Sequence, residues 1–223
     1  MSFRFVAEHL SLLVQGTAET LYMTAASTLL AYLIGLPLGV LLVVSAKDGI
    51  RPNRVLNAVL GGIVNIGRSI PFIILIVALI PFTRLMVGTS IGSTAVIVPL
   101  TIGAAPFVAR LVESSLRELD AGVIEAARSM GATSRQIVWK VLLPESVPSL
   151  VRGVSITTIT LVGYSAMAGA VGGGGLGNIA MQYGYYRYEY DMMLVTLVLL
   201  VAIVQLIQLA FNLLARRIDK RNR

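Results

Sequence analysis

The stretch EAARSMGATSRQIVWKVLLP occupies residues 125–144 and decides how the rest of the chain is interpreted. It is polar, basic and rich in helix-forming residues, with Gly131 near its middle and Pro144 at its end. On both sides lie apolar stretches long enough to cross a bilayer, for which a helix needs about 20 residues. The stretch therefore indicates a structured loop between membrane helices, which a membrane subunit needs if a soluble motor is to drive it.

Composition places the chain in a membrane. Of its 223 residues, 56% are hydrophobic and 13% are charged, and the mean hydropathy is +0.83. A soluble domain carries about 25% charged residues, so this chain has too little polar surface to coat a globule. Because a backbone in lipid must satisfy its own hydrogen bonds, we expect an all-α integral membrane protein for which membrane lipid is part of the solvent.

The same composition disfavours two kinds of site. The chain has no cysteine and a single histidine, His9, so we expect no metal site. The net charge of +7 is compatible with nucleic-acid binding. The basic residues, however, flank apolar runs instead of forming one patch, so we expect no nucleic-acid partner.

Five apolar runs are long enough to be transmembrane helices. They cover residues 20–44, 56–80, 91–111, 150–171 and 192–214. Several contain proline, which membrane helices tolerate where neighbours satisfy the freed carbonyl. Pro37, Pro71, Pro99 and Pro106 are therefore expected to kink the spans and not to mark their ends. The predicted organisation is an N-terminal segment (1–19), a transmembrane domain (20–214) with a helical loop at about 112–149, and a basic tail (215–223).

The basic residues predict the orientation. With five spans, three basic regions fall on one side of the membrane, and the positive-inside rule places that side in the cytosol. The N-terminus is then outside, and the 112–149 loop and the C-terminus are cytosolic. The basic residues expected inside are Lys47, Arg51, Arg54, Arg110, Arg117, Arg128, Arg135, Lys140, Arg152, Arg216, Arg217, Lys220, Arg221 and Arg223. Only Arg4, Arg84 and Arg187 are expected outside, and Arg68 lies within the second span.

The cytosolic loop is predicted to form two short helices at an angle. Asp120 can cap the first helix, which runs through Val123 to Met130, and Gly131 permits the left-handed conformation that ends it. Thr133 and Gln136 have the spacing of a capping box, which begins the second helix. Pro144, followed by Pro148, is expected to break this second helix before the fourth span.

The first loop helix has the features of a docking element. Ala126 and Ala127 keep one surface low, so that a groove on another protein can approach closely, and Glu125 offers that protein a fixed negative charge. The alternative is an ordinary amphipathic helix that lies on the lipid headgroups.

These residues carry a resemblance to a known family. Glu125-Ala-Ala, Gly131 and Leu143-Pro144 resemble the cytoplasmic loop of type I ATP-binding-cassette importer permeases, with Val141 where that pattern usually has isoleucine. The resemblance extends to the permease of bacterial methionine-uptake transporters over most of the chain beyond its first twenty residues. The matching stretches include NIGRSIPFIIL (65–75), VGTSIG (87–92), VPLTIGAAPF (98–107), TLVGYSAM (160–167) and QYGY (182–185).

The resemblance implies an assembly and a function. It implies a homodimer in the bacterial inner membrane, two ATP-binding-cassette ATPase subunits, and an external methionine-binding lipoprotein. ATP and Mg²⁺ would bind to the ATPase subunits, so this chain is expected to carry no cofactor and to catalyse no reaction. It would translocate D- and/or L-methionine by alternating access. The motif residues Glu125, Ala126, Ala127, Gly131, Leu143 and Pro144 would couple it to the ATPase.

No nucleotide site is predicted on this chain. A P-loop requires a lysine preceded by glycine, whereas the three lysines follow Ala46, Trp139 and Asp219. The glycine-rich segment at 172–177 matches G-x-G-x-x-G formally, but it ends a membrane span instead of following a strand. We expect it to be a flexible or re-entrant segment at the outer mouth.

Four residues are candidates for a pore or gate. Arg68 is interpreted as the one intramembrane charge. It either faces the pore, or caps carbonyls near Pro71 or lies at a dimer seam, and the structural interpretation is favoured. Tyr164, Ser165 and Met167 lie in a run of small residues, which suits either close helix packing or a gate.

Two alternative functions follow from these patterns. A stand-alone secondary transporter usually shows inverted repeats, and none is visible here. The other alternative is a permease of the same superfamily that transports a different amino acid. It stays open because an external binding protein would set most of the specificity.

Overall fold

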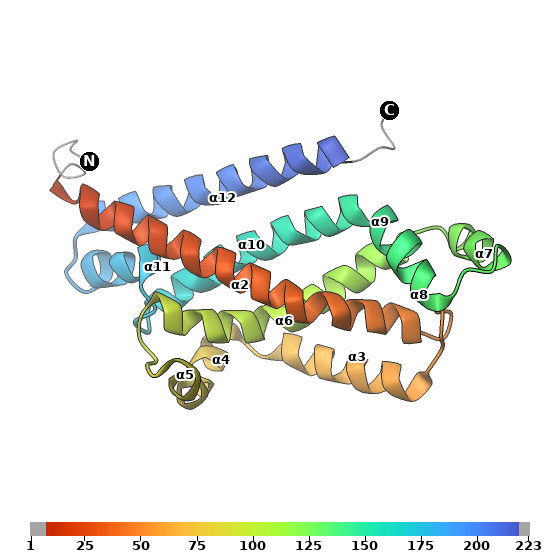
Figure 1. Ribbon diagram of the computed structural model, residues 1–223. Coiled ribbons are helices and arrows are strands. Elements are labelled where there is room, and N and C mark those ends of the chain that lie inside the picture. The colour runs from red at the N-terminus through yellow and green to blue at the C-terminus, as the bar shows by residue number, and fades with distance from the viewer. Residues whose placement is uncertain (1–7, 219–223) are drawn as a thin grey trace. The chain divides into compact units, whose positions relative to one another are not determined.

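The structure is a computed structural model that describes residues 8–218, and every regular element among them is helical. The elements are α2 (Leu10–Ser45), α3 (Arg54–Ser69), α4 (Phe72–Ala78), α5 (Ile80–Val87), α6 (Ser93–Arg117), α7 (Ala121–Ser129), α8 (Ser134–Ile137), the π-helix η1 (Val138–Leu142), α9 (Leu143–Glu145), α10 (Val147–Gly169), α11 (Gly175–Ile179), the π-helix η2 (Ala180–Tyr185) and α12 (Tyr190–Ile218). Figure 1 shows the chain as a ribbon. The predicted all-α class is confirmed.

Four helices are long and apolar enough to cross a membrane by themselves: α2, α6, α10 and α12. A fifth crossing requires the pair α3 and α4, which are bent by 98° at their junction. The second predicted span, 56–80, is therefore a broken element. The parts of the predicted N-terminal segment and C-terminal tail at 1–7 and 219–223, including Lys220, Arg221 and Arg223, lie outside the described residues.

The prolines behave in two different ways. Pro37 lies inside α2, and Pro99 and Pro106 lie inside α6, so these helices continue through them as predicted. At Pro71 the predicted kink in the second span takes the form of a 98° bend between two helices, because α3 ends at Ser69 and Pro71 stands at the N-cap of α4. The backbone of Pro71 is extended, with φ −61° and ψ 130°. A proline without a backbone N–H is well placed just before a new helix.

The described helices pack into two compact units. The first contains the described residues up to Leu30 together with Ile70–Ala104 and Thr158–Gln208. The second contains Ala31–Ser69, Ala105–Thr157 and the described residues from Leu209 onward. The long helices α2, α6, α10 and α12 contribute one part to each unit.

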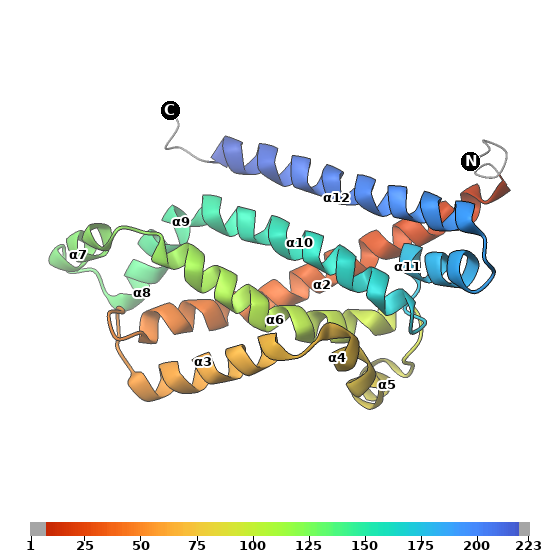
Figure 2. The ribbon, with the colours of Figure 1, turned by 180° about the vertical axis from the view of Figure 1, so that it is seen from behind.

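The second unit has a core where α2, α3 and α6 meet. Leu42, Val64 and Ala109 are buried together there, and Figures 1 and 2 both show α3 beside the second half of α2. A Cβ on Gly35 or Gly39 of α2 would lie 2.6 Å from the side chain of Val108 or Val112 of α6, respectively. The Gly-x-x-x-Gly spacing in α2 therefore lets it approach α6 closely, as small residues do between membrane helices.

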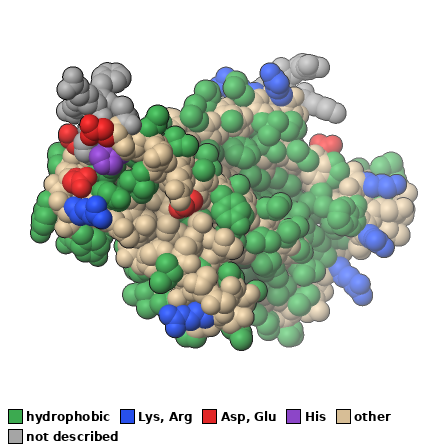
Figure 3. All heavy atoms as spheres, turned by 60° about the vertical axis from the view of Figure 1, so that its left-hand side comes forward, with side chains coloured by type: hydrophobic (Ala, Val, Ile, Leu, Met, Phe, Trp, Pro, Cys, Tyr) green, Lys and Arg blue, Asp and Glu red, His purple; other side chains and the backbone are tan. Residues whose placement is uncertain are grey.

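The first unit has its own apolar core, built mainly from α2, α10, α11 and α12. Its buried members are Leu13, Val162, Leu176, Ile179, Met192, Val195 and Ile203. Many other large apolar side chains are exposed, among them Leu29, Leu33 and Leu206. Figure 3 shows hydrophobic side chains over much of the face in view, interrupted by only a few charged ones. Such exposure is typical of a surface that meets lipid or another subunit.

Candidate functional site

The first loop helix, α7, has the limits that its sequence predicts. The carboxylate of Asp120 accepts a hydrogen bond of 2.7 Å from the backbone N–H of Gly122, which caps the helix N-terminus. At the other end Gly131 has φ +79°, and its backbone N–H donates to the carbonyl of Arg128 at 2.9 Å. An L-residue with a branched side chain is strained in this conformation. Gly131 therefore fixes where the helix stops and how the chain turns.

The second loop helix begins at the predicted capping box. The Thr133 hydroxyl accepts from the Gln136 backbone N–H, and the Gln136 side chain accepts from the Thr133 backbone N–H at 2.8 Å. The helical path then continues through η1 and α9. Pro144 itself does not break this helix, because it stands inside the continuous path in α9, and the predicted break before the fourth span lies two residues later. The wider π-turn of η1 comes just before Pro144, and an irregular turn of this kind accommodates a proline that lacks an N–H.

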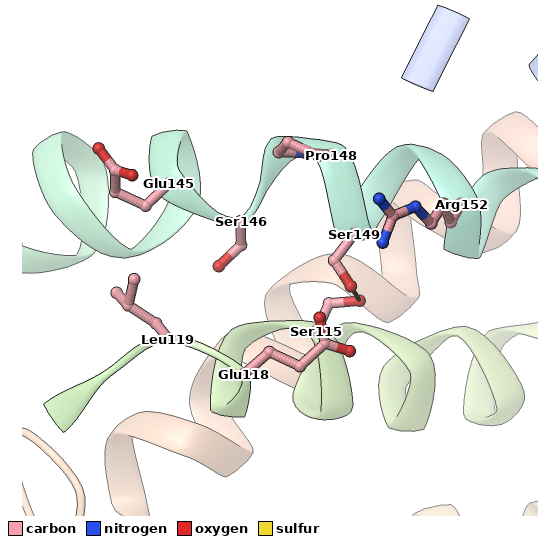
Figure 4. Close-up of a pocket in the computed structure, with 8 residues that line it drawn as sticks. All are labelled: Ser115, Glu118, Leu119, Glu145, Ser146, Pro148, Ser149 and Arg152. Carbon is pink, nitrogen blue, oxygen red and sulfur yellow. Dashed lines mark hydrogen bonds between the residues drawn. The ribbon is translucent and has the colours of Figure 1, made fainter. Parts of the chain in front are cut away.

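The break before the fourth span occurs at Ser146 instead. Ser146 joins α9 to α10, and Pro148 is in the first turn of α10, where a proline is tolerated. A polar cavity of about 130 Å³ lies beside this break, and Figure 4 shows side chains from the end of α6 and the start of α10 around it. Across it, the Ser149 hydroxyl donates to Ser115 Oγ at 3.1 Å. Ser146 is buried, and its hydroxyl has no hydrogen-bond partner among the described residues.

The predicted coupling residues do not all share one exposed face. Glu125, Ala126, Gly131 and Pro144 are exposed, whereas Leu143 is half-buried. Ala127 has only 4% of its surface exposed and packs against its own chain. Of the two neighbouring alanines that were expected to form a shallow contact surface, only Ala126 is therefore accessible. Val123 and Met130, three and four residues from Ala126, are large apolar side chains that are also exposed.

The inner side of α7 is anchored to the loop that follows α2. Arg128 Nη2 donates to the carbonyl of Gly49 at 3.2 Å. A cavity of about 240 Å³ lies between them, lined by Ile124 and Glu125 from α7 and by Asp48 from the loop. Glu125 therefore stands at the edge of this cavity with its side chain accessible. An exposed carboxylate on an anchored helix is a suitable contact for a basic group on another protein.

The candidate gate residues differ in their surroundings. The Tyr164 ring stacks on Phe72 with their centroids 4.5 Å apart, and the Ser165 hydroxyl is buried and donates to the carbonyl of Val162 at 2.8 Å. Met167 is different, because half of its surface, 50%, is exposed. Gly163 is also exposed, one turn earlier on α10. Residues four apart lie on the same face of a helix, so Gly163 and Met167 present one accessible strip.

Arg68 stands one residue from the end of α3 and is exposed. Among the described residues it makes no hydrogen bond or ion pair, so it does not cap carbonyls near Pro71. Both remaining interpretations, a pore-facing group and a group at a seam between copies, place it where another molecule can reach it.

The glycine-rich segment at 172–177 is more ordered than its sequence suggests. Gly172, Gly174 and Gly175 have φ values of +83°, +77° and +73°. The Glu19 carboxylate accepts from the Gly175 N–H at 2.7 Å, and Thr20 Oγ1 accepts from the Leu176 N–H at 3.0 Å. Side chains of α2 thus cap α11, so the segment forms a defined turn, which does not fit the flexible alternative and leaves the re-entrant one as a prediction.

Sequence reasoning missed a second charged group within a predicted span. Arg110 stands at the end of the predicted span 91–111 and was counted with the basic residues of the cytosolic side, but α6 continues to Arg117. Arg110, Glu113 and Arg117 therefore lie on one helix, where Glu113 pairs with both arginines. Opposite charges spaced three and four residues apart are a helix signal, and this spacing could have revealed the longer helix. Within residues 8–218 no cluster of metal-ligating side chains is found.

The chain is similar to known proteins along nearly its whole length. The family described as "Binding-protein-dependent transport system inner membrane component" matches residues 17–223. The probable D-methionine transport system permease protein MetI of Vibrio cholerae serotype O1 is 54% identical, over 99% of this chain and 100% of its own length. The methionine import system permease protein MetP of Bacillus subtilis strain 168 is 50% identical, over 92% of this chain and 93% of its own.

A solved structure gives the same result in three dimensions. It is described as showing inward facing conformations of the MetNI methionine ABC transporter, and one of its chains matches with a TM-score of 0.95 and 56% identity. The match covers 99% of this chain and all of the other.

Proposed function

This chain belongs to the family of inner-membrane components of binding-protein-dependent transport systems, and we propose that it is the membrane-spanning permease of an ATP-driven methionine importer. Relatives that share half or more of its residues over nearly their whole length are named for methionine transport. Membership of this family also argues against a stand-alone secondary transporter.

The observation that carries the proposal is the exposed, anchored helix α7. Asp120 and Gly131 fix its two ends, Arg128 ties it to the preceding loop, and Glu125 and Ala126 remain exposed. An element fixed in this way moves with the membrane helices when a partner pulls on it. A partner with a basic group beside a shallow groove would contact Glu125 and pack over Ala126.

The proposed assembly contains two copies of this chain, two ATPase subunits and an external methionine-binding lipoprotein. The ATPase subunits would hold ATP and Mg²⁺ and close on each other when ATP binds. Each α7 would follow its ATPase subunit, and the spans would alternate between inward-open and outward-open. The coupling set is Glu125, Ala126, Ala127, Gly131, Leu143 and Pro144, where Ala127 would support the helix from its buried side.

The proposed orientation places the N-terminus outside and the C-terminus in the cytosol of a bacterial cell. Because cysteine is absent from the chain, single cysteines can be introduced and labelled without interference. In spheroplasts, a membrane-impermeant maleimide is expected to label Thr89→Cys at once, and Ser134→Cys only after permeabilisation. Both positions are exposed. Labelling of Ser134→Cys in intact spheroplasts would contradict the orientation.

The substrate is tested by uptake in cells. Deleting the gene is expected to remove most high-affinity uptake of trace radiolabelled methionine, because the proposed importer would drive that uptake with ATP. D- and L-methionine are measured separately, and a plasmid copy of the wild-type chain is expected to restore uptake. If methionine uptake is unchanged while uptake of a polar amino acid is lost, the chain is instead a permease for that amino acid.

A further inference from the structure

A charged cluster lies in the last turns of α6, in the second unit. Arg110 and Glu113 of α6 are two helical turns and one turn before the end of that helix at Arg117. Glu113 is buried, with 9% of its surface exposed, and the Arg110 side chain is largely covered. Burying a charged group costs free energy unless the group is paired and hydrogen-bonded, so the partners of these two residues matter. The proposed function, which relies on α7, assigns no role to either residue.

Arg110 joins two membrane helices. Its Nη1 donates to Glu113 Oε2 at 2.6 Å on its own helix. Its Nη2 donates to Asn65 Oδ1 at 2.8 Å and to the carbonyl of Gly61 at 3.3 Å, both on α3. A guanidinium is a planar fork that can hold several acceptors at once, which a lysine ammonium does less precisely. The geometry therefore ties the position of α3 to that of α6.

The cluster continues toward the anchored loop helix. Arg117 Nε donates to Glu113 Oε1 at 3.3 Å, and Arg117 Nη1 lies 3.8 Å from Asp48 Oδ2. The next residue after Asp48 is Gly49, whose carbonyl accepts from Arg128 of α7. The contact between Arg117 and Asp48 is exposed and therefore weak. The hydrogen bonds around Arg110 are more buried than this contact and are the stronger part of the connection.

One nitrogen of the Arg110 guanidinium lacks a hydrogen-bond acceptor in this arrangement. Arg110 Nε is buried and has no acceptor among the described residues. A buried donor without a partner destabilises the arrangement that contains it. The two acceptors on α3, Gly61 and Asn65, are one helical turn apart. A shift of α3 along α6 therefore changes which of them can accept a hydrogen bond from the Arg110 guanidinium. The cluster thus favours discrete positions of the two helices over a continuous slide.

We propose that Arg110 is a positioning residue that holds α3 in register with α6, so that movement of α7 is passed to α3. The proposal rests on the proposed function, because it assigns Arg110 a part in coupling ATP hydrolysis to transport. A purely structural arginine would instead affect assembly, ATP hydrolysis and transport together.

The test uses the complex of the full chain with its ATPase subunits, reconstituted in proteoliposomes with the binding protein and radiolabelled methionine outside. Arg110→Lys keeps the charge opposite Glu113 but removes the fork, and Asn65→Leu removes the acceptor on α3 while Arg110 and Glu113 stay paired. Methionine taken up per ATP hydrolysed is expected to fall about tenfold in each variant, the change that follows from losing a charge-assisted hydrogen bond. The double variant is expected to be no worse than Arg110→Lys alone, because both changes remove the same bond.

Arg84→Leu is the matched control, since Arg84 also donates to a polar side chain, that of Ser90 at 3.0 Å, but does not join two membrane helices. It is expected to keep the wild-type ratio. A wild-type ratio in Arg110→Lys or Asn65→Leu would overturn the proposal, as would additive losses in the double variant. It would also be overturned by failed assembly, or by equal losses of hydrolysis and uptake. Failure of the wild-type complex itself to take up methionine would refute the proposed function and, with it, the proposal that rests on it, whereas normal wild-type uptake with a wild-type ratio in the variants overturns this proposal alone.

Discussion

Glu125→Lys is expected to abolish most ATP-driven uptake while the protein still inserts and folds. The Glu125 side chain is exposed at the edge of α7 and has no hydrogen bond or ion pair among the described residues, so its loss leaves the chain's own packing intact. In the proposed assembly the new ammonium would oppose a basic group on the ATPase subunit. Placing like charges in a protein interface costs about 2 kcal/mol or more, which lowers affinity by over tenfold.

Two measurements check this expectation. The amount of ATPase subunit that co-purifies with the variant should fall, and uptake in proteoliposomes should fall to about a tenth or less. Glu118→Lys is the matched control, because Glu118 is also an exposed glutamate of the cytosolic loop but lies between α6 and α7, away from every member of the coupling set. Normal co-purification and uptake in Glu125→Lys would show that α7 does not dock through this residue.

The same experiment includes a pair of substitutions at Gly131. Gly131 has φ +79° and nothing within 4 Å of the place where a Cβ would stand, so backbone conformation alone decides what it tolerates. Asparagine adopts this left-handed conformation more readily than a β-branched residue does. Valine there costs at least about 1–2 kcal/mol, the general cost of the conformation. We therefore expect Gly131→Asn to couple normally and Gly131→Val to lose uptake, since only valine changes the end of α7.

The loop was predictable because its signals are local. The Asp120 cap, the Thr133–Gln136 box and the left-handed Gly131 each depend on residues no more than a few positions apart, and each is confirmed. The five apolar runs likewise gave the helical class and the approximate positions of the crossings. These features follow from the hydropathy of each stretch by itself, which does not depend on the helices that pack beside it.

What the sequence did not predict depends on contacts distant along the chain. Pro71 ends a helix and Pro99 does not, although both lie in apolar runs, because the surrounding packing decides whether the chain continues straight. Ala127 is buried and Ala126 exposed because α7 rests on its own chain. The contacts of Arg110 were not predicted because its partners, Gly61 and Asn65, lie on another helix.

A second large effect is expected at Met167, which we propose as a gate. Met167 is half exposed on α10, whereas its neighbour Ala168 is buried and Tyr164 is held against Phe72. One turn away Gly163 has no atom within 4 Å of a built Cβ, so another helix can come close there. If two copies of α10 face each other in the proposed homodimer, their two thioethers would fill a narrow path. An unbranched side chain adapts to irregular gaps, and an apolar constriction blocks polar solutes by dewetting.

Met167→Ala is therefore expected to let methionine-sized zwitterions leak through the reconstituted complex without ATP. We expect an increase of about tenfold, which corresponds to lowering the barrier by ~1.4 kcal/mol. Met167→Leu, which keeps a long apolar side chain, is expected to stay closed. Ile156→Ala is the matched control, because Ile156 lies on the same helix and is 48% exposed, against 50% for Met167. Passive influx of radiolabelled methionine into proteoliposomes distinguishes the variants. An equal, negligible leak in Met167→Ala and Ile156→Ala would show that Met167 only packs against a neighbouring surface.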